Sequence, residues 1–288
     1  MGVKILITGK RGYVGNKLES YLTSKDHIIE RIDMKTNEWK MKSLKNYDVI
    51  IHLAALVHNN MPNAQMVDYM NVNYHLTKDL AEKAKNDGVQ HFIFFSTMSV
   101  FGIDGSLISD VEINKNTPCN PDTMYGHSKL LAEETLQKLN SDIFRINIVR
   151  PPMIYGKNAP GNFQQLIKIA KFWPIYPNIN NKRSVIYIEN LTEHLNKLIK
   201  EQKSGITHPQ NSEYMNTNEV LSAIRHTLKK KPNIIKIPIP RQLLKWFNGI
   251  TVINKIYGNL TYTKDIDDSK EDYQNYVSFQ SSMNKTLK

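Results

Sequence analysis

Residues 3–15, VKILITGKRGYVG, join an apolar run to a glycine-rich turn, and this combination decides the fold class. Val3–Thr8 has the unbroken hydrophobicity of a strand that is covered on both faces, and residues 13–22 have the pattern of a helix. Three glycines stand around the junction at intervals of three: Gly9, Gly12 and Gly15. Such glycines permit a tight turn and a close approach of the backbone to a pyrophosphate, which the helix N-terminus attracts. With Asp33 at the end of the next apolar run, the stretch predicts a dinucleotide-binding βαβ unit.

The alternation of strand and helix patterns continues to about Arg150. Further strands are predicted at 27–32, 48–53, 91–96 and 143–149, and further helices at 67–84 and 125–140. Strands that alternate with crossover helices form a parallel sheet. We therefore expect an α/β protein with a Rossmann-type, doubly wound parallel sheet.

Beyond Arg150 prolines interrupt this rhythm, and a strand-helix pair at 184–200 is expected to return to the sheet. The sequence thus predicts a dinucleotide-binding domain from residues 1–155 together with about 184–200. Residues from about 156 to 183 and from 201 to 288 are expected to form a smaller C-terminal substrate lobe.

The charge balance is basic, with 38 Lys and Arg against 27 Asp and Glu and a formal net charge of +11. Apart from Lys229–Lys231 the lysines are scattered, and aromatic residues do not interleave with a basic patch. This pattern favours a solvated surface, and no nucleic-acid partner is expected.

Cysteine and histidine are too sparse for a metal or disulfide framework. Cys119 is the only cysteine, and the histidines lack metal-ligand spacing, so no metal site is expected. The longest mostly apolar stretch, Val49–Val57, is too short to cross a bilayer, and the chain opens directly into a strand without a signal peptide. A cytoplasmic protein with no integral membrane segment is expected.

Two features of the first βαβ unit favour different coenzymes. Asp33 follows the second strand, where a carboxylate accepts hydrogen bonds from the adenosine ribose and repels a 2′-phosphate, which favours NAD(H). Lys10 and Arg11 lie in the glycine turn, where a guanidinium can pair with a 2′-phosphate, which favours NADP(H). Both coenzymes stay open at this point.

Tyr125-Gly-His-Ser-Lys129 carries the sharpest chemical signal. Tyr and Lys at positions i and i+4 of a helix share one face, with Cβ atoms about 6 Å apart. A nearby ammonium favours the phenolate, so the pKa of Tyr125 is expected to fall toward neutral pH. A phenol tuned in this way can protonate a carbonyl oxygen or deprotonate an alcohol. Thr97 follows the fourth strand, at the edge of the sheet where ligands bind, and is expected to hold the same substrate oxygen.

An ordered set of motifs covers about residues 1–200: Thr8-Gly9-x-x-Gly12-x-x-Gly15, His52-Leu-Ala-Ala55, Asn71-Val72-Asn73, Ser96-Thr97-x-x-Val100-Phe101-Gly102, Tyr125-x-x-x-Lys129 and Arg150-Pro-x-x-Ile154-Tyr155-Gly156. In this order the motifs resemble those of the extended short-chain dehydrogenase/reductases. That family comprises nucleotide-sugar epimerases, dehydratases and 4-keto reductases, so the resemblance implies hydride chemistry at C4 of a nucleotide sugar.

The resemblance implies a role for named residues of this chain. Thr97, Tyr125 and Lys129 are implied as the catalytic set, with Lys129 also on the nicotinamide ribose. The implied coenzyme-binding residues are Gly9, Arg11, Gly12, Tyr13, Val14, Gly15, Asp33, Leu53, Ala54, Ala55, Asn71, Tyr125, Lys129 and Pro151. The implied substrate-binding residues are Thr97, Met98, Ser99, Tyr125 and Arg183; Arg183 is similar to the family's arginine that holds the nucleotide diphosphate. His58, in the loop after the third strand, is a further candidate for contact with the sugar.

Three departures from the family pattern reduce the number of reactions that this chain is expected to catalyse. Family dehydratases carry Asp-Glu after the catalytic Thr, where this chain has Met98 and Ser99, which do no acid-base work. Epimerising reductases need a Cys beside the catalytic Ser, and Cys119 lies elsewhere. The Lys10-Arg11 turn, the short chain and the apolar Met98 favour reduction of a UDP-4-keto-6-deoxy-N-acetylhexosamine to UDP-N-acetylfucosamine or UDP-N-acetylquinovosamine, for surface polysaccharide synthesis. An upstream 4,6-dehydratase would then supply the substrate, and a homodimer is a further expectation from the family.

Two other interpretations stay open. A UDP-sugar 4-epimerase for UDP-GlcNAc or UDP-Glc would keep NAD tightly bound, and a non-catalytic Rossmann module would only sense NADPH. The intact set of Thr97, Tyr125 and Lys129 disfavours a sensor, which needs no proton donor. In the C-terminal lobe, Trp246 and Phe247 fit a core helix better than a membrane-facing patch.

Overall fold

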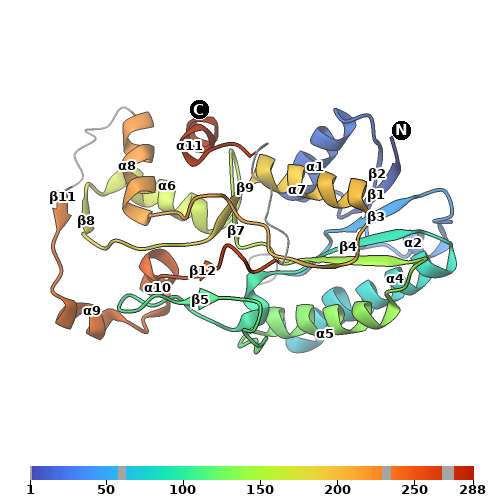
Figure 1. Ribbon diagram of the computed structural model, residues 1–288, viewed down its shortest axis with the longest axis horizontal. Helices are drawn as coiled ribbons and strands as arrows, with labels where there is room; N and C mark the ends of the chain where they lie inside the picture. The colour runs from blue at the N-terminus through green and yellow to red at the C-terminus, as the bar shows by residue number, and fades with distance from the viewer. Residues whose placement is uncertain (1, 58–62, 229–234, 268–275) are drawn as a thin grey trace. The chain divides into compact units, whose positions relative to one another are not determined.

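The computed structural model describes residues 2–57, 63–228, 235–267 and 276–288 (Figure 1). The chain divides into two compact units. Unit 1 comprises Met1–Gly102, Pro118–Pro151 and Leu191–Pro209, and unit 2 comprises Ile103–Thr117, Pro152–Asn190 and Gln210–Lys288.

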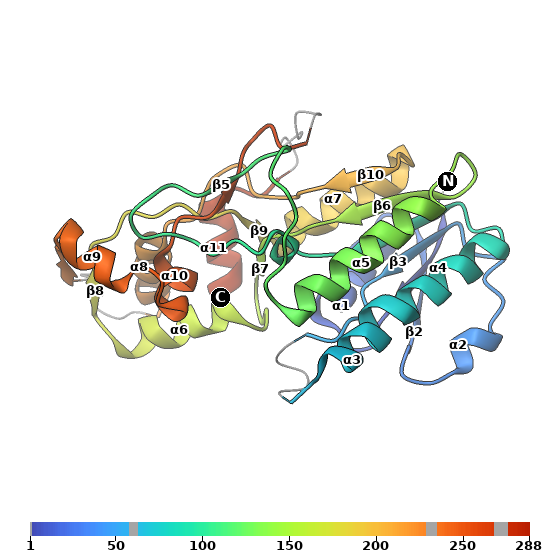
Figure 2. The same ribbon diagram turned by 90° about the horizontal axis from the view of Figure 1, so that it is seen from below.

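Unit 1 is built around a six-stranded parallel sheet with the order β10-β6-β4-β3-β1-β2. The strands are β1 (Lys4–Thr8), β2 (Ile28–Ile32), β3 (Val49–His52), β4 (His91–Phe95), β6 (Arg145–Val149) and β10 (Gly205–Thr207). Figures 1 and 2 show α1 (Tyr13–Thr23) and α7 (Ile188–Glu201) on one face of the sheet and α4 (Leu76–Asn86) and α5 (Met124–Leu139) on the other. Cover on both faces explains why β1, β3 and β4 are buried along almost their whole length. The expected Rossmann-like α/β class is confirmed.

The direction of the strand order changes between β1 and β3. From β1 the chain moves outward to β2 at the sheet edge and then returns to β3 on the other side of β1. Only α2 (Glu38–Met41) intervenes as a helix between β2 and β3. Ligands of open parallel sheets bind at the carboxyl ends of the strands, at such a switch point. The glycine turn after β1 and the loop after β3 are therefore placed to flank a ligand.

The helix predicted at 67–84 is present, but it is not a uniform α-helix. It starts as α3 (Met66–Tyr69), continues as a π-helical segment, η2 (Met70–His75), and ends as α4. π-helical turns are rare and often occur at functional sites. The widened turn contains the Asn71-Val72-Asn73 motif.

The strand expected near Ser184 does not join the main sheet, and this prediction is wrong. β9 (Val185–Tyr187) pairs instead with β7 (Met153–Tyr155) in a separate two-stranded sheet of unit 2. The main sheet is completed by β10, which follows α7 and pairs with β6.

Unit 2 combines short helices with three two-stranded sheets. β8 (Ile175–Pro177) pairs with β11 (Ile235–Ile237), and β5 (Glu112–Ile113) pairs with β12 (Thr261–Tyr262). This second pairing places residues 103–117 in unit 2. Its helices are α6 (Asn162–Phe172), α8 (Thr217–Thr227), α9 (Arg241–Phe247), α10 (Thr251–Tyr257) and α11 (Phe279–Leu287). α6 and α8 are joined by Arg225, whose Nη1 donates to the carbonyl of Ala170 at 3.0 Å.

Within the described part of the chain, no helix combines the length and the hydrophobicity that crossing a bilayer requires. The same residues contain no cluster of three or more His, Cys, Asp or Glu side chains placed to hold a metal ion.

Candidate active site

The three glycines of the turn after β1 differ in their surroundings. Gly9 has φ +90°, which favours glycine, and its N–H donates to the carbonyl of Ile32 at 3.0 Å. A Cβ on Gly15 would lie 2.5 Å from Nη2 of Arg31, so a larger residue here would displace the Arg31 guanidinium. At Gly12, by contrast, an added Cβ would meet no described atom within 4 Å. Gly12 is also the N-cap of α1 and offers no side-chain cap, so this helix N-terminus can receive an anion.

Arg31, on β2, is hydrogen-bonded to the glycine turn and to α1, and sequence reasoning missed it. Its Nη1 donates to Asn16 Oδ1 and to Glu19 Oε2, both at 3.1 Å, and its Nη2 donates to the carbonyl of Gly9. The side chain is 7% exposed, and among the described residues its buried Nε has no hydrogen-bond partner. The available signal was a lone cation inside an otherwise mostly apolar strand, IIERI. Its unused donor fits a phosphate oxygen of a dinucleotide at this turn.

The charged residues that bear on the choice between NAD(H) and NADP(H) also lie at or near this turn. Lys10 and Arg11 are exposed, and Asp33 is half-buried at the end of β2, where it accepts from the N–H of Lys35 at 3.0 Å. Tyr13 and Val14, in the first turn of α1, are half-buried. The turn therefore carries both exposed cations and a carboxylate next to the end of β2.

A buried hydroxyl ties the end of β1 to the loop after β3. Oγ1 of Thr8 accepts from the N–H groups of Leu53 and Ala54, each at 3.1 Å. The same oxygen lies 2.7 Å from Nδ1 of His52. The loop that follows β3, which includes Ala55, is thereby fixed beside the glycine turn.

His52 continues this network into the helix that follows. Its Nε2 lies 2.9 Å from Oγ1 of Thr77, whose own hydroxyl donates to the carbonyl of Asn73 at 2.8 Å. Because the Thr77 proton is committed to that carbonyl, Nε2 of His52 must be the donor to Thr77, and Nδ1 must accept the proton of Thr8. Burial, with the charge of Lys129 as a second cause, lowers the pKa of His52 to about 3. His52 is therefore a neutral structural group that joins three segments of the site.

Asn73, and not Asn71, is the asparagine that the fold buries. Its Oδ1 accepts from the N–H of Leu56 at 2.7 Å, and its Nδ2 donates to the carbonyl of Leu56 and to Oγ of Ser128, both at 3.0 Å. Asn71 points outward and is exposed. The two asparagines stand two positions apart, on opposite faces of the helix, and the motif alone did not separate them. Through Ser128, Asn73 connects the loop after β3 to the helix that carries Tyr125.

The side chains of Thr97 and Tyr125 meet in unit 1. Thr97 begins η3 (Met98–Phe101) and accepts from the N–H of Ser99 at 3.1 Å. Its hydroxyl is hydrogen-bonded to that of Tyr125, which lies in the first turn of α5. Thr123 caps this helix by accepting from Gly126 N–H at 3.1 Å. β4 and the start of α5 thus bring two hydroxyl groups to one point.

Burial, and not an ammonium, controls the acidity of Tyr125. Desolvation raises the pKa of Tyr125 to about 12, against the smaller lowering effect of the bond to Thr97. Lys129 Nζ instead donates to the carbonyl of Phe95 at 2.6 Å and lies 4.3 Å from the ring centroid of Phe94. Burial lowers the pKa of Lys129 to about 7, partly opposed by Glu133. The expected lowering of the Tyr125 pKa is therefore wrong for this structure, because the sequence shows spacing but not desolvation.

The remaining predicted residues fall in different places. The N–H of Met98 donates to the carbonyl of Pro151 at 3.1 Å, which joins the ends of β4 and β6. Arg183 belongs to unit 2, where it donates to the carbonyls of Asn254 at 3.1 Å and Gly258 at 2.6 Å. Burial lowers the pKa of Arg183 to about 10, with Asp104 opposing. His58 lies outside the described residues.

A family model described as the NAD dependent epimerase/dehydratase family matches residues 5–210, which is most of the chain. The chain belongs to the NAD-dependent epimerase/dehydratase family. It is 29% identical over 292 residues to the UDP-glucose 4-epimerase of Vibrio cholerae, covering 93% of this chain and 88% of the relative. It is 25% identical over 280 residues to the N-acetyl-alpha-D-glucosaminyl-diphospho-ditrans,octacis-undecaprenol 4-epimerase of Escherichia coli O157:H7, covering 90% and 82%.

The fold of the chain is also similar to that of a solved structure. The UDP-glucuronic acid 4-epimerase from Bacillus cereus in complex with NAD superposes with a TM-score of 0.73 at 18% identity, covering 99% of this chain and 97% of that one. The match covers both units. At this identity the likeness establishes the fold alone.

A buried ion pair lies one helical turn beyond Lys129 in this family member. Glu133 is fully buried, and its Oε2 accepts from Nε and Nη2 of Arg150 at 3.1 and 2.5 Å. Ser96 donates to the other oxygen of the same carboxylate. Arg150 is also hydrogen-bonded to Cys119, whose thiol pKa is raised by burial. Sequence reasoning missed this group, although Tyr125, Lys129 and Glu133 follow one another at intervals of four.

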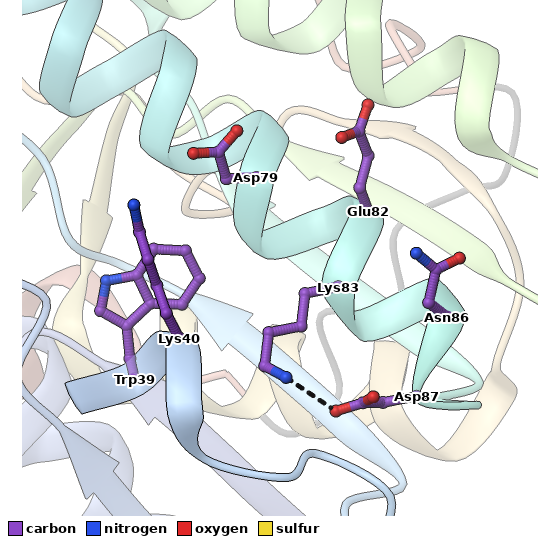
Figure 3. Close-up of a pocket in the computed structure, with 7 residues that line it drawn as sticks. All are labelled: Trp39, Lys40, Asp79, Glu82, Lys83, Asn86 and Asp87. Atoms are coloured by element: carbon purple, nitrogen blue, oxygen red, sulfur yellow. Dashed lines mark hydrogen bonds and ion pairs between the residues drawn. The ribbon is translucent and has the colours of Figure 1, made fainter. Parts of the chain in front are cut away.

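A charged pocket of about 480 Å³ lies away from these residues (Figure 3). It is lined by residues of α2, of α4 and of the turn after α4: Trp39, Lys40, Asp79, Glu82, Lys83, Asn86 and Asp87. Asp87 accepts from Lys83 at 3.2 Å and from the N–H of Leu44 at 2.7 Å. The end of α4 leads into the start of β4, whereas coenzymes bind at the carboxyl ends of strands. The pocket is therefore separate from the candidate active site.

The burial of neutral His52 makes stability depend on pH. The unfolded chain binds a proton at His52 below about pH 6.5, and the folded chain does so only near pH 3. Stability from this group is thus complete above pH 6.5 and is lost as the pH falls toward 3. We expect the free energy of unfolding to fall by roughly 3 kcal/mol more in the wild type than in His52→Gln between pH 7 and pH 4.

Urea unfolding at both pH values measures this difference. The glutamine variant keeps a donor and an acceptor but cannot be protonated. His226→Gln, at an exposed position, is the matched control and should follow the wild type. Equal acid sensitivity of the wild type and His52→Gln would contradict the assignment.

Proposed function

We propose that this protein reduces the C4 keto group of a UDP-4-keto-6-deoxy-N-acetylhexosamine, giving UDP-N-acetylfucosamine or UDP-N-acetylquinovosamine. The observation that carries the proposal is the bonded pair of hydroxyls, Thr97 and Tyr125, with Lys129 one helical turn further on. Two hydroxyl groups that converge at the carboxyl edge of a parallel sheet can hold one carbonyl oxygen from two directions.

The glycine turn and its surroundings fit a dinucleotide coenzyme. The uncapped N-terminus of α1, the open space at Gly12 and the unused Nε of Arg31 suit its phosphates. Leu53, Ala54 and Ala55 are proposed to border it, and Asp33 to meet the adenosine ribose. When bound, the reduced nicotinamide supplies the hydride for C4. Lys10, Arg11 and Arg31 support NADP(H), while Asp33 keeps NAD(H) in contention.

The acidity of Tyr125 supports the direction of the reaction. With a pKa of about 12, the phenol is protonated at neutral pH and is ready to give its proton to the oxyanion that forms at C4. Thr97 holds the same oxygen. Lys129, whose pKa burial lowers to about 7, is proposed to hold the nicotinamide ribose when the coenzyme is bound. An enzyme that began by oxidising an alcohol would need the phenolate at the start.

The residues after Thr97 disfavour elimination of water. Met98 and Ser99 occupy the first turn of η3, where related dehydratases carry an acid pair. Neither side chain exchanges a proton at neutral pH. We therefore propose that Met98 and Ser99 contact the sugar, together with Arg183 on the diphosphate and His58 on the hexose. A separate dehydratase must then supply the 4-keto substrate.

A 4-epimerase is the second candidate, and the relatives favour it. Both curated relatives reported above are named as 4-epimerases. An epimerase would use the same Thr97, Tyr125 and Lys129, but would retain its coenzyme through both half-reactions. The two proposals differ in whether reduced coenzyme is consumed.

Mixing the protein with NADPH or NADH and a UDP-4-keto-6-deoxy-N-acetylhexosamine separates the candidates. We expect absorbance at 340 nm to fall, with one coenzyme oxidised per sugar reduced. Constant absorbance, together with interconversion of UDP-GlcNAc and UDP-GalNAc and with NAD bound to the purified protein, would contradict the reductase and support the epimerase. Inactivity in both assays, with NADPH still bound, would support the sensor.

A further inference from the structure

Large apolar side chains are exposed together on unit 2. Phe172 and Trp173, at the end of α6, are 70% and 66% exposed, and Trp246 on α9 is 83% exposed. Leu243, Phe247 and Val252 are exposed beside them in the chain, on α9 and α10. The expectation that Trp246 belongs to a core helix is therefore wrong, because α10 supplies the buried side chains here, Asn254 and Tyr257.

These side chains belong to one end of the unit. β8, which follows Trp173, pairs with β11, and β11 leads directly into α9. Asn178, just after β8, donates its N–H to the carbonyl of Ile237 on β11 at 2.8 Å. Figures 1 and 2 both place α9 and β8 at the same end of unit 2, with α10 close by. We call the six exposed residues Phe172, Trp173, Leu243, Trp246, Phe247 and Val252 the aromatic tip.

Two long stretches that lie mostly in unit 2, and that include the tip residues, carry an excess of positive charge. Residues 151–188 and 220–264 contain no Asp or Glu, and together they hold 14 Lys and Arg. That number exceeds the net charge of +11, so the rest of the chain is slightly negative. Lys171, Lys245 and Lys255 are exposed within three positions of tip residues in the sequence. Exposed lysines therefore flank the aromatic tip.

This combination identifies the partner by its chemistry. Trp and Phe side chains are favoured at the boundary between headgroups and acyl chains, and nearby lysines bind anionic headgroups. A second copy of the chain would set lysine against lysine, because a symmetric contact uses the same patch twice. Exposed aliphatic side chains such as Leu243 and Val252 suit hydrocarbon better than the polar surface of a nucleic acid. We propose that the aromatic tip docks peripherally onto a bilayer that contains anionic lipid.

The proposal rests on exposure and charge in unit 2 and is independent of the reaction proposed for unit 1. It predicts that the full-length protein binds vesicles of phosphatidylglycerol and phosphatidylcholine but not vesicles of phosphatidylcholine alone. Binding should weaken strongly between 0.1 and 0.5 M NaCl, because salt screens the lysines. The chain has three tryptophans, and the one outside the tip, Trp39, is buried in unit 1. A blue shift of tryptophan emission on vesicle binding therefore reports insertion of the tip.

Matched variants distinguish vesicle binding through the aromatic tip from binding that depends only on the net charge of the protein. Lys171→Glu/Lys245→Glu/Lys255→Glu should lower the vesicle partition coefficient by at least about 100-fold. Lys45→Glu/Lys138→Glu/Lys203→Glu changes the net charge equally at exposed positions of unit 1 and should bind within about threefold of wild type. Trp246→Ala should lower partitioning by about tenfold or more, whereas Ile143→Ala, at an 80% exposed site of unit 1, should have little effect.

Vesicle co-sedimentation and light scattering decide the outcome, with thermal unfolding as the check that each variant is folded. Selective loss of binding in the tip variants supports the proposal. Absence of binding by wild type, equal binding to neutral vesicles, or equal losses in tip and control variants would overturn it. A change from dimer to monomer in the tip variants without vesicle binding would instead assign the tip to a second copy, and would also overturn it.

Discussion

Tyr125→Phe is expected to lower turnover of the 4-keto sugar by at least 100-fold and by as much as about 10⁴-fold. The substitution removes one oxygen, the group proposed to protonate C4, and leaves the ring in place. Lys129 cannot substitute for it, since its Nζ is directed to the carbonyl of Phe95, and the aliphatic hydroxyl of Thr97 is a weaker acid than a phenol. The rate of NADPH consumption measures the effect.

Coenzyme affinity is the readout that distinguishes lost chemistry from lost structure. Fluorescence titration with NADPH should give a Kd within a few-fold of wild type for Tyr125→Phe. Tyr155→Phe is the matched control, because Tyr155 is also buried and its pKa is also raised to about 12, but it bonds Ser282 and Asn211 within unit 2. Turnover in Tyr125→Phe equal to that of Tyr155→Phe would refute the proton-donor role.

Glu133→Leu is expected to destabilise the protein by about 3–5 kcal/mol, because it leaves the guanidinium of Arg150 buried without its counter-charge. Arg150 is 8% exposed and Glu133 is fully buried, so water cannot replace the lost carboxylate. For a domain of this size the shift in Tm should be roughly 5–15 °C. Thermal unfolding measures it, and Glu134→Leu, at the exposed neighbouring position, should change Tm by only a degree or two.

A double variant tests whether the stability lost in Glu133→Leu comes from the unpaired charge of Arg150. Glu133→Leu/Arg150→Met replaces both charges by apolar groups, which often restores much of the stability lost by breaking a buried pair. We expect the double variant to unfold at a higher temperature than Glu133→Leu alone. A double variant that is as unstable as the sum of the two single variants would contradict this account of the pair.

The sheet could be predicted well because its buried parallel strands are rich in apolar residues and alternate with helical patterns. β1, β3, β4 and β6 all lie within the predicted segments. β10 could not be predicted in this way, since GIT is only three residues long and partly exposed. The role expected for the strand near Ser184 failed for a related reason, because a three-residue strand carries too little pattern to choose between two sheets.

The residues of the site divide in a similar way. Thr97 and Tyr125 follow from order and spacing along the chain, and the structure brings their hydroxyls together. Arg31, His52 and Asn73 act through partners that are distant in the sequence. Asn73 also lies in a π-helical segment, which the sequence did not predict. The pKa of Tyr125 depends on burial, which spacing does not encode. Long-range contacts and desolvation are thus what sequence reasoning could not supply here.

Tracing a deuterium label tests the central proposal most directly. The protein is incubated with NADPH that carries two deuterium atoms at C4 of the nicotinamide, and with the UDP-4-keto-6-deoxy-N-acetylhexosamine. NMR and mass spectra of the product should show one deuterium, located at C4 of the hexose, for each coenzyme oxidised. A product with only protium at C4, or an unchanged substrate in a preparation that interconverts UDP-GlcNAc and UDP-GalNAc, would contradict the proposed reduction.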